Sequence, residues 1–203
     1  MTGWTEKPEI ATVSETIAVL GGRGISAELV PDRASALDAV VRKIPEGSEV
    51  VTGASKSLEE IGFIDLLKSG SHGWVNLKEK ILSEKDHTRL MELARWATAT
   101  QFFLGSVQAV ARTGEVVVAS ATGMQAAAYA FSAGNVIWVV GTQKIVPNLE
   151  DAMRRVREHC LPLEDARIKS EGFPGSYLGK LLVVERERPG RISVVFVNES
   201  LGF

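Results

Sequence analysis

Apolar segments with the length of buried strands alternate with amphipathic segments of helical period along most of the chain. Residues 49–52, 116–120 and 135–141 are rich in valine, and each precedes a segment with the features of a helix start. Because strands that alternate with helices pair in parallel and are covered on both sides, this pattern predicts an α/β fold with a largely parallel open sheet and helices on both faces. A chain of 203 residues fits a single domain, expected to span residues 1–203.

The C-terminal part of the chain departs from this alternation. Residues 180–185 and 192–198 both have strand-like apolar patterns, and the segment between them contains the turn residues Pro189 and Gly190. Two strands joined by so short a turn are expected to pair with each other. The pattern therefore predicts a C-terminal antiparallel hairpin, appended to the domain as residues 179–203.

Two strand-to-helix corners share the same arrangement of a glycine and a lysine. In VVTGASK, Gly53 ends a strand and Lys56 stands just before a helix, and WVVGTQK repeats this arrangement with Gly141 and Lys144. The carboxyl ends of parallel strands meet at one edge of a sheet, and ligands of such sheets bind outside that edge. Both lysines are therefore expected at the same edge.

The first of these corners leads into a helix with a strong start signal. Ser57 stands three residues before Glu60, which is the spacing of a capping box, so the helix is expected to begin at Ser57. Free amides at a helix start and a nearby lysine favour an anion, although for this corner alone a capped helix with a solvated lysine is the simpler interpretation. A third corner at Thr122 and Gly123 adds to the hypothesis of an anion site. The residues expected to bind a small anionic metabolite, a carboxylate or a phosphate, are Gly53, Ser55, Lys56, Ser57, Thr122, Gly123, Gln125, Gly141 and Lys144.

Composition argues against several other classes of partner and site. The net charge of −2 gives no electrostatic reason to expect nucleic acid or an anionic membrane surface. Apolar runs such as 136–140 are too short to cross a bilayer, and the charged N-terminal residues do not resemble a signal peptide, so a cytoplasmic location is expected. One cysteine and three widely separated histidines predict no metal site, no iron–sulfur site and no intrachain disulfide.

Five blocks of the sequence form a recognisable series: SKSLEEIG (55–62), TGEVV (113–117), ATGMQAAA (121–128), GTQKIVPNLEDAMRRVREHCLPLEDAR (141–167) and RISVVFVNESLGF (191–203). In this order they resemble successive blocks of the LUD-domain family, in the short form of the lactate-utilisation protein C. The resemblance runs from about residue 10 to the end, and its longest block, at 141–167, is the most specific because it is ungapped. It implies a fold similar to that of sugar-phosphate isomerases and coenzyme A transferases. It also implies a role near the oxidation of L-lactate to pyruvate, beside iron–sulfur and flavin partner subunits.

The chain departs from the family pattern in the turn before TGEVV. Arg112 stands where relatives often carry an acidic residue, and Met124 and Gln125 stand where an Asn-Arg pair is common. Coenzyme A transferases of the similar fold use a glutamate nucleophile, and an arginine cannot replace it because it stays protonated and offers no lone pair. We therefore expect no acyl transfer through a carboxylate at this turn, and predict that Arg112 binds a substrate carboxylate with two parallel hydrogen bonds.

Three kinds of function are consistent with the sequence. The first is an accessory or regulatory protein of lactate utilisation that binds a small anion. The second is an enzyme of the sugar-phosphate isomerase, acyl or coenzyme A transferase, or cyclo-ligase type, for which Glu115 is the one acid in the turn region. The third is an interaction module that docks or self-associates into a homo-oligomer through the hairpin at 179–203. No pattern in the sequence identifies a cofactor or a catalytic residue.

Overall fold

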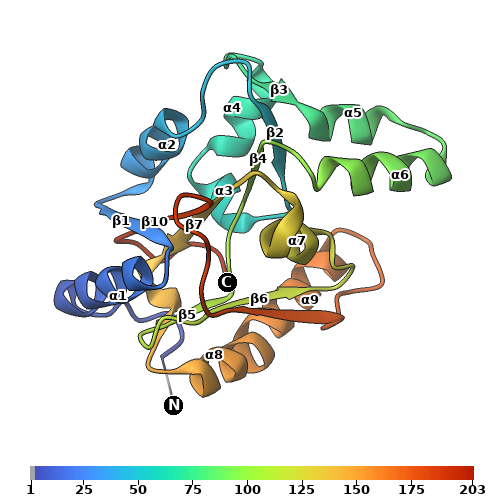
Figure 1. Cartoon of the computed structure of the whole chain (residues 1–203). Helices are drawn as coiled ribbons and strands as arrows, with labels where there is room; N and C mark the ends of the chain where they lie inside the picture. Colours follow the sequence, from blue (N-terminus) through green and yellow to red (C-terminus); the bar gives the residue numbers. More distant parts are fainter. Residues whose placement is uncertain (1–2) are drawn as a thin grey trace.

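The computed structural model describes residues 3–203 and contains a six-stranded sheet whose neighbouring strands are all parallel. This sheet runs through the middle of the molecule (Figure 1). The prediction of an α/β fold with a largely parallel sheet is confirmed. The strands, in their order across the sheet, are β1 (Ser26–Val30), β10 (Ile192–Val197), β7 (Asn135–Gly141), β4 (Phe102–Gly105), β2 (Glu49–Thr52) and β3 (Val75–Asn76).

Helices cover both faces of this sheet because its strands are apolar on both sides. In β7, Ile137 and Val139 pack toward one face, whereas Trp138 and Val140 pack toward the other. The first face is covered by α2 (Arg33–Arg42), α3 (Lys56–Glu60) and α4 (Phe63–Ser69). The second is covered by α1 (Ile10–Gly22), the π-helix η1 (Ala128–Ser132) that continues α7 (Met124–Ala127), and the second sheet. Beyond the end of β3, α5 (Leu77–Ser83) and α6 (His87–Ala97) lie side by side and project from the body of the molecule (Figure 1).

A second sheet of four strands forms a separate layer. One of its faces packs on the core of the large sheet, and the other packs against a long helical segment (Figure 1). Its strands, in order, are β8 (Ile145–Val146), β5 (Ala109–Ala111), β6 (Val116–Ser120) and β9 (Lys180–Val184). The helical segment consists of α8 (Leu149–Arg155), the π-helix η3 (Val156–Cys160) and α9 (Leu161–Ser170). No helix within residues 3–203 is both long enough and apolar enough to cross a membrane.

The prediction of a C-terminal antiparallel hairpin is wrong. Strand β9 pairs antiparallel with β6 in the second sheet, whereas β10 pairs parallel with both β1 and β7 in the large sheet. The reason lies in burial: Val194 and Phe196 enter one core and Val195 and Val197 enter the other, so β10 has the two apolar faces of a central strand. The turn at Pro189 therefore belongs to a connection between two sheets, and the hypothesis of docking through a hairpin loses its structural basis.

Candidate functional site

A cavity of about 410 Å³ lies at the carboxyl ends of β2, β4 and β7, between the two sheets and the start of α9. Six residues expected to bind an anion line this cavity, and they come from three separate corners of the chain. Lys56 and Lys144 are among them, so both lysines border one cavity. The six residues are Ser55, Lys56, Ser57, Thr122, Gln125 and Lys144.

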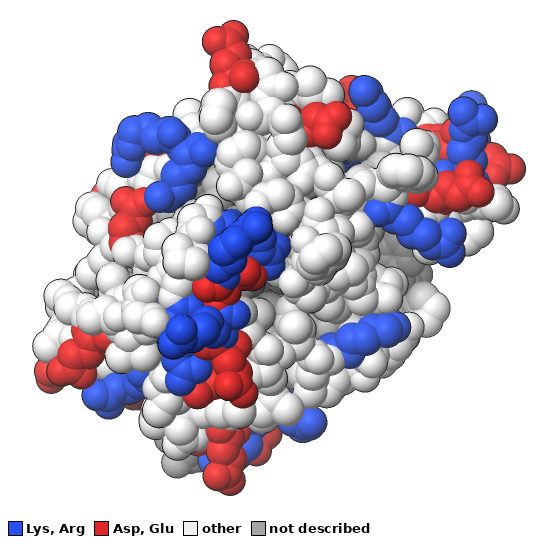
Figure 2. Space-filling model, viewed as in Figure 1, with Lys and Arg blue, Asp and Glu red and all other residues white. Residues whose placement is uncertain are grey.

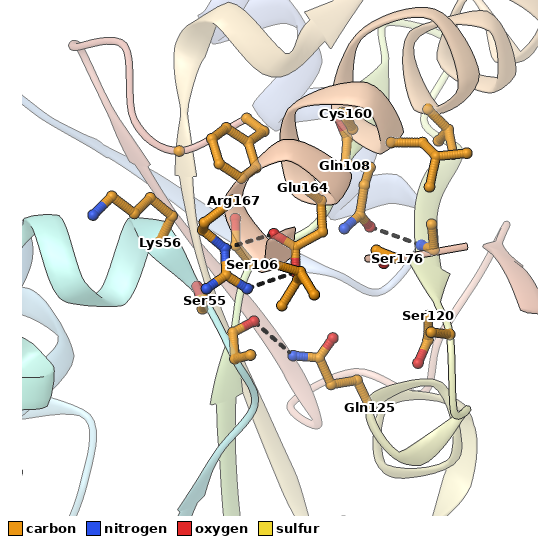
Figure 3. Close-up of a pocket in the computed structure, with 18 of the residues that line it drawn as sticks. Ser55, Lys56, Ser106, Gln108, Ser120, Gln125, Cys160, Glu164, Arg167 and Ser176 are labelled. Carbon is orange, nitrogen blue, oxygen red and sulfur yellow. Dashed lines mark hydrogen bonds and ion pairs between the residues drawn. The ribbon is translucent and has the colours of Figure 1, made fainter. Parts of the chain in front are cut away.

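Three glycines that were also expected to bind the anion do not line the cavity. They allow neighbouring groups to pack closely beside it. A Cβ atom on Gly53 would lie 1.8 Å from the Gln125 Nε2 atom, which donates a hydrogen bond to the Ala54 carbonyl at 3.1 Å (Figure 3). A Cβ atom on Gly141 would lie 2.6 Å from the backbone nitrogen of Leu201. Gly123 has a φ of 95°, a conformation that favours glycine. These glycines shape the site by letting side chains and backbone approach.

Arg112 does not line the cavity. Gln108 and Ala119 line it at one end of the β5–β6 pair, whereas Arg112 lies in the turn at the other end. There its Nη2 atom lies 3.3 Å from the carboxylate of Glu15 in α1. Glu115 in the same turn pairs with the Arg23 guanidinium at 2.9 Å. Antiparallel pairing of β5 with β6 therefore removes both residues from the site.

The helix that follows β2 begins one residue earlier than predicted. Ser55 is its N-cap, since the Ser55 Oγ atom accepts a hydrogen bond from the Leu58 N–H at 3.3 Å. Glu60 does not complete a capping box, because its carboxylate accepts from the backbone N–H of Gly202 at 3.0 Å. The Ser57 hydroxyl is therefore not needed for capping and lies in the cavity wall.

Lys144 is the most unusual residue of the cavity. Only 3% of its surface is exposed, and its Nζ atom donates to Ser57 Oγ at 3.2 Å and to Ser106 Oγ at 3.1 Å. Burial, assisted by the positive charge of Arg155, lowers the pKa of Lys144 to about 7. Both the ammonium and the neutral amine are therefore well populated near neutral pH.

The lysine and its two serines follow three adjacent strands. Ser57 comes after β2, Ser106 directly after β4, and Lys144 in the short 3₁₀ helix η2 (Thr142–Lys144) directly after β7. The strand order β2-β4-β7 brings the three side chains together. Ser106 was not among the residues predicted from the sequence. The pattern that indicates it is the Gly-Ser pair directly after the apolar run FFL at 102–104.

A second buried cation lies beside the cavity. Arg155, the last residue of α8, is fully buried. Its guanidinium donates hydrogen bonds to Cys160 Sγ at 3.0 Å and to the Trp4 carbonyl at 3.2 Å. Within residues 3–203, neither Arg155 nor Lys144 forms an ion pair with a carboxylate. Cys160 lines the cavity, and burial raises the pKa of its thiol, which keeps the thiol protonated.

The other cations at this cavity differ, because each has a carboxylate partner. Arg167 binds Glu164 at 2.7 Å (Figure 3), and Lys56 lies 3.2 Å from Glu59. The outer surface shows the same balance, since Lys and Arg are interspersed with Asp and Glu over the visible face (Figure 2). Lys144 and Arg155 therefore place positive charge without a carboxylate partner in the interior beside the cavity. The residues that the structure describes contain no cluster of His, Cys, Asp and Glu suited to hold a metal ion.

Comparison with known proteins identifies the family. No curated protein matches the sequence. Among solved structures, a DUF162 family protein from Deinococcus radiodurans shares the fold, with a TM-score of 0.56 at 13% identity over 93% of this chain and 97% of that one. A D-ribose-5-phosphate isomerase, solved with phospho-erythronic acid, is a weaker match, with a TM-score of 0.41 at 14% identity over 83% of this chain and 95% of that one. The model of the LUD domain matches residues 13–171. The chain therefore belongs to the LUD domain family, which is associated with lactate utilisation.

Proposed function

We propose that this protein binds a small organic anion, a carboxylate or a phosphate, in the cavity beside Lys144, as an accessory or regulatory component of lactate utilisation. The observation that carries the proposal is the buried Lys144 amine, which contacts two hydroxyls and no carboxylate. An ammonium group without a counter-ion is costly to bury, so a ligand anion at this position stabilises its charged form.

The remaining lining suits a small polar ligand. A cavity of about 410 Å³ lies within the range typical of metabolite sites. Lys56 stands at its border, and the hydroxyls of Ser55 and Thr122 and the amide of Gln125 supply neutral hydrogen-bonding groups. Arg155 adds positive potential from behind the wall. The proposed preference for an anion thus rests on two buried cations, Lys144 and Arg155, and on uncharged hydrogen-bond donors.

Binding is expected to be coupled to the protonation of Lys144. An anion favours the ammonium form, so binding near pH 7 takes up part of a proton and raises the pKa of Lys144 above about 7. Affinity should therefore fall as the pH rises from 6.5 to 8.5. The uptake is measurable as a dependence of the calorimetric enthalpy on the ionisation enthalpy of the buffer.

Titration calorimetry with L-lactate, pyruvate and inorganic phosphate tests the proposal. Lys144→Met should weaken binding of the preferred anion roughly tenfold to hundredfold, because a charge-assisted hydrogen bond contributes about 1.5–3 kcal/mol. Lys78→Met is the matched control: Lys78 also has a lowered pKa through burial and donates to a hydroxyl, Thr52 Oγ1 at 3.2 Å, yet it does not line the cavity. Equal affinities for the Lys144 variant and the wild type would refute the proposal.

The proposal extends to partners that the family resemblance implies. Iron–sulfur and flavin subunits of a lactate-oxidising complex are the expected partners, and a homo-oligomer is a further expectation. Co-purification of the full chain at low salt, followed by light scattering and by absorbance measurements for flavin and iron–sulfur chromophores, tests both. Recovery of the chain alone as a monomer would count against these partners while leaving the anion site unaffected.

A further inference from the structure

We propose that Ser106 is a nucleophile and Lys144 its general base, so that the cavity hydrolyses activated esters or thioesters of small carboxylic acids. The inference rests on the proposed function in one respect, since it places the acyl group in the same anion-binding cavity. It goes further because it assigns turnover to the site. The Glu115 region plays no part in it, since that turn lies at the far end of β5 and β6.

The geometry is that of a serine activated by a lysine. A nucleophile and its base lie within hydrogen-bonding reach when their heavy atoms are about 2.6–3.2 Å apart, and a third group orients the base. The Lys144 Nζ atom is 3.1 Å from Ser106 Oγ. The third group is Ser57, whose Oγ atom accepts from Lys144 at 3.2 Å and lies 3.5 Å from the Leu201 carbonyl oxygen. Each role is thus filled by a residue from a different strand end.

Burial decides which of the two serines can react. Ser57 is 1% exposed and Lys144 is 3% exposed, whereas Ser106 is half-buried and lines the cavity. Ser106 is one of the residues that line the cavity and is labelled in Figure 3. A substrate in the cavity therefore meets the Ser106 hydroxyl first. Ser57 acts as a positioning residue that holds the amine toward Ser106.

General-base action requires a neutral amine, and the surroundings of Lys144 provide one. Burial and the nearby Arg155 favour the neutral form, while the carboxylate of Glu60 opposes this more weakly. His159 faces the same group of charges, and its own pKa is lowered by burial and by Arg155 and Lys144. A lysine that loses its proton near pH 7 can accept a proton from a serine hydroxyl at physiological pH.

The reaction balances with water as the only co-reactant. The Ser106 oxygen bonds to the acyl carbon while its proton passes to Lys144, and the bond from the acyl carbon to the alcohol oxygen or thiol sulfur breaks. The leaving group takes the proton from Lys144, which leaves an acyl ester on Ser106. Water then attacks this ester and gives a proton to Lys144, which returns it to the Ser106 oxygen as the carboxylic acid departs.

A fluorophosphonate probe with p-nitrophenyl acetate as substrate tests the inference. The wild-type chain should be labelled at Ser106, as located by peptide mass spectrometry, and both labelling and hydrolysis should rise from pH 6 to pH 8.5 with a midpoint near the pKa of Lys144, about 7. Ser106→Ala should abolish both, and Lys144→Met should slow both about a hundredfold or more. Ser57→Ala should shift the midpoint of the pH profile, which a merely structural serine would not do.

Matched controls separate this chemistry from surface reactivity and misfolding. Ser83→Ala removes an exposed serine and Lys78→Met removes the other lysine that donates to a hydroxyl; both variants should react like wild type. Circular dichroism and urea denaturation show whether each variant is folded. No labelling of wild type, labelling at another residue, or an unchanged rate in Lys144→Met would overturn the inference. Phosphate binding without labelling would refute the inference alone, whereas labelling without binding of any tested anion would refute the proposed function alone.

Discussion

Replacing Lys144 with methionine should stabilise the protein near neutral pH while it impairs the site. Methionine fills similar space without a charge, and the two serines can still bond each other, since Ser57 Oγ already lies 3.3 Å from Ser106 Oγ. Burial lowers the pKa of Lys144 from its ordinary value of 10.5 to about 7. Because one pKa unit corresponds to 1.36 kcal/mol, keeping the amine charged in the folded chain costs on the order of 5 kcal/mol.

The sign of the pH dependence follows from where the proton is bound. Between about pH 7 and pH 10.5 the unfolded chain holds a proton on Lys144 and the folded chain does not. Unfolding therefore takes up a proton in this window, so the wild-type free energy of unfolding rises with pH, by up to about 1.4 kcal/mol per pH unit from this site. Below pH 7 the full cost is present in the wild type. The methionine variant lacks this contribution at every pH.

Urea denaturation of both chains, followed by circular dichroism at pH 6.5, 8.0 and 9.5, measures the effect. The methionine variant should be more stable at pH 6.5 by up to about 5 kcal/mol, the cost of keeping Lys144 charged in the folded chain. The difference in the free energy of unfolding should shrink as the pH rises, because only the wild type gains stability when Lys144 loses its proton. The other groups titrate equally in both chains. Parallel pH profiles, or a less stable variant at pH 6.5, would refute the assignment of Lys144 as a buried, charge-destabilised lysine.

Three further changes probe the site and the fold. Gly53→Ala should weaken anion binding about tenfold with little change in unfolding temperature, because the new Cβ atom displaces the mobile end of Gln125; unchanged affinity by calorimetry would contradict this. Arg112→Ala should leave anion affinity unchanged, since Arg112 pairs with Glu15 outside the cavity, and a tenfold loss would reinstate it as a ligand-binding residue. Deletion of residues 179–203 should give an aggregating chain, because it removes a central strand of the large sheet; a soluble monomer with native circular dichroism would show that β10 is dispensable.

Local patterns in the sequence determined the fold class and much of the site. The alternation of strand and helix, and the repeated Gly-x-x-Lys at two strand ends, depend on neighbouring residues only. Parallel strands necessarily have their carboxyl ends at one edge, so the shared position of Lys56 and Lys144 followed from the fold class. The caps at Asp32 and Asn148 were likewise predictable from their own helices, since each bonds an amide three residues on.

Only the tertiary structure decided which distant segments became neighbours. Ser106 joins Lys144 and Ser57 because β4 lies between β2 and β7, and strand order is not written in any local pattern. Arg112 lies outside the site because β5 and β6 pair antiparallel in a second sheet. Strand β10 leaves its apparent hairpin partner because a strand with two apolar faces is more stable between β1 and β7, where both faces are buried. Sheet pairing and burial are properties of the whole chain, whereas periodicity and capping are properties of short segments.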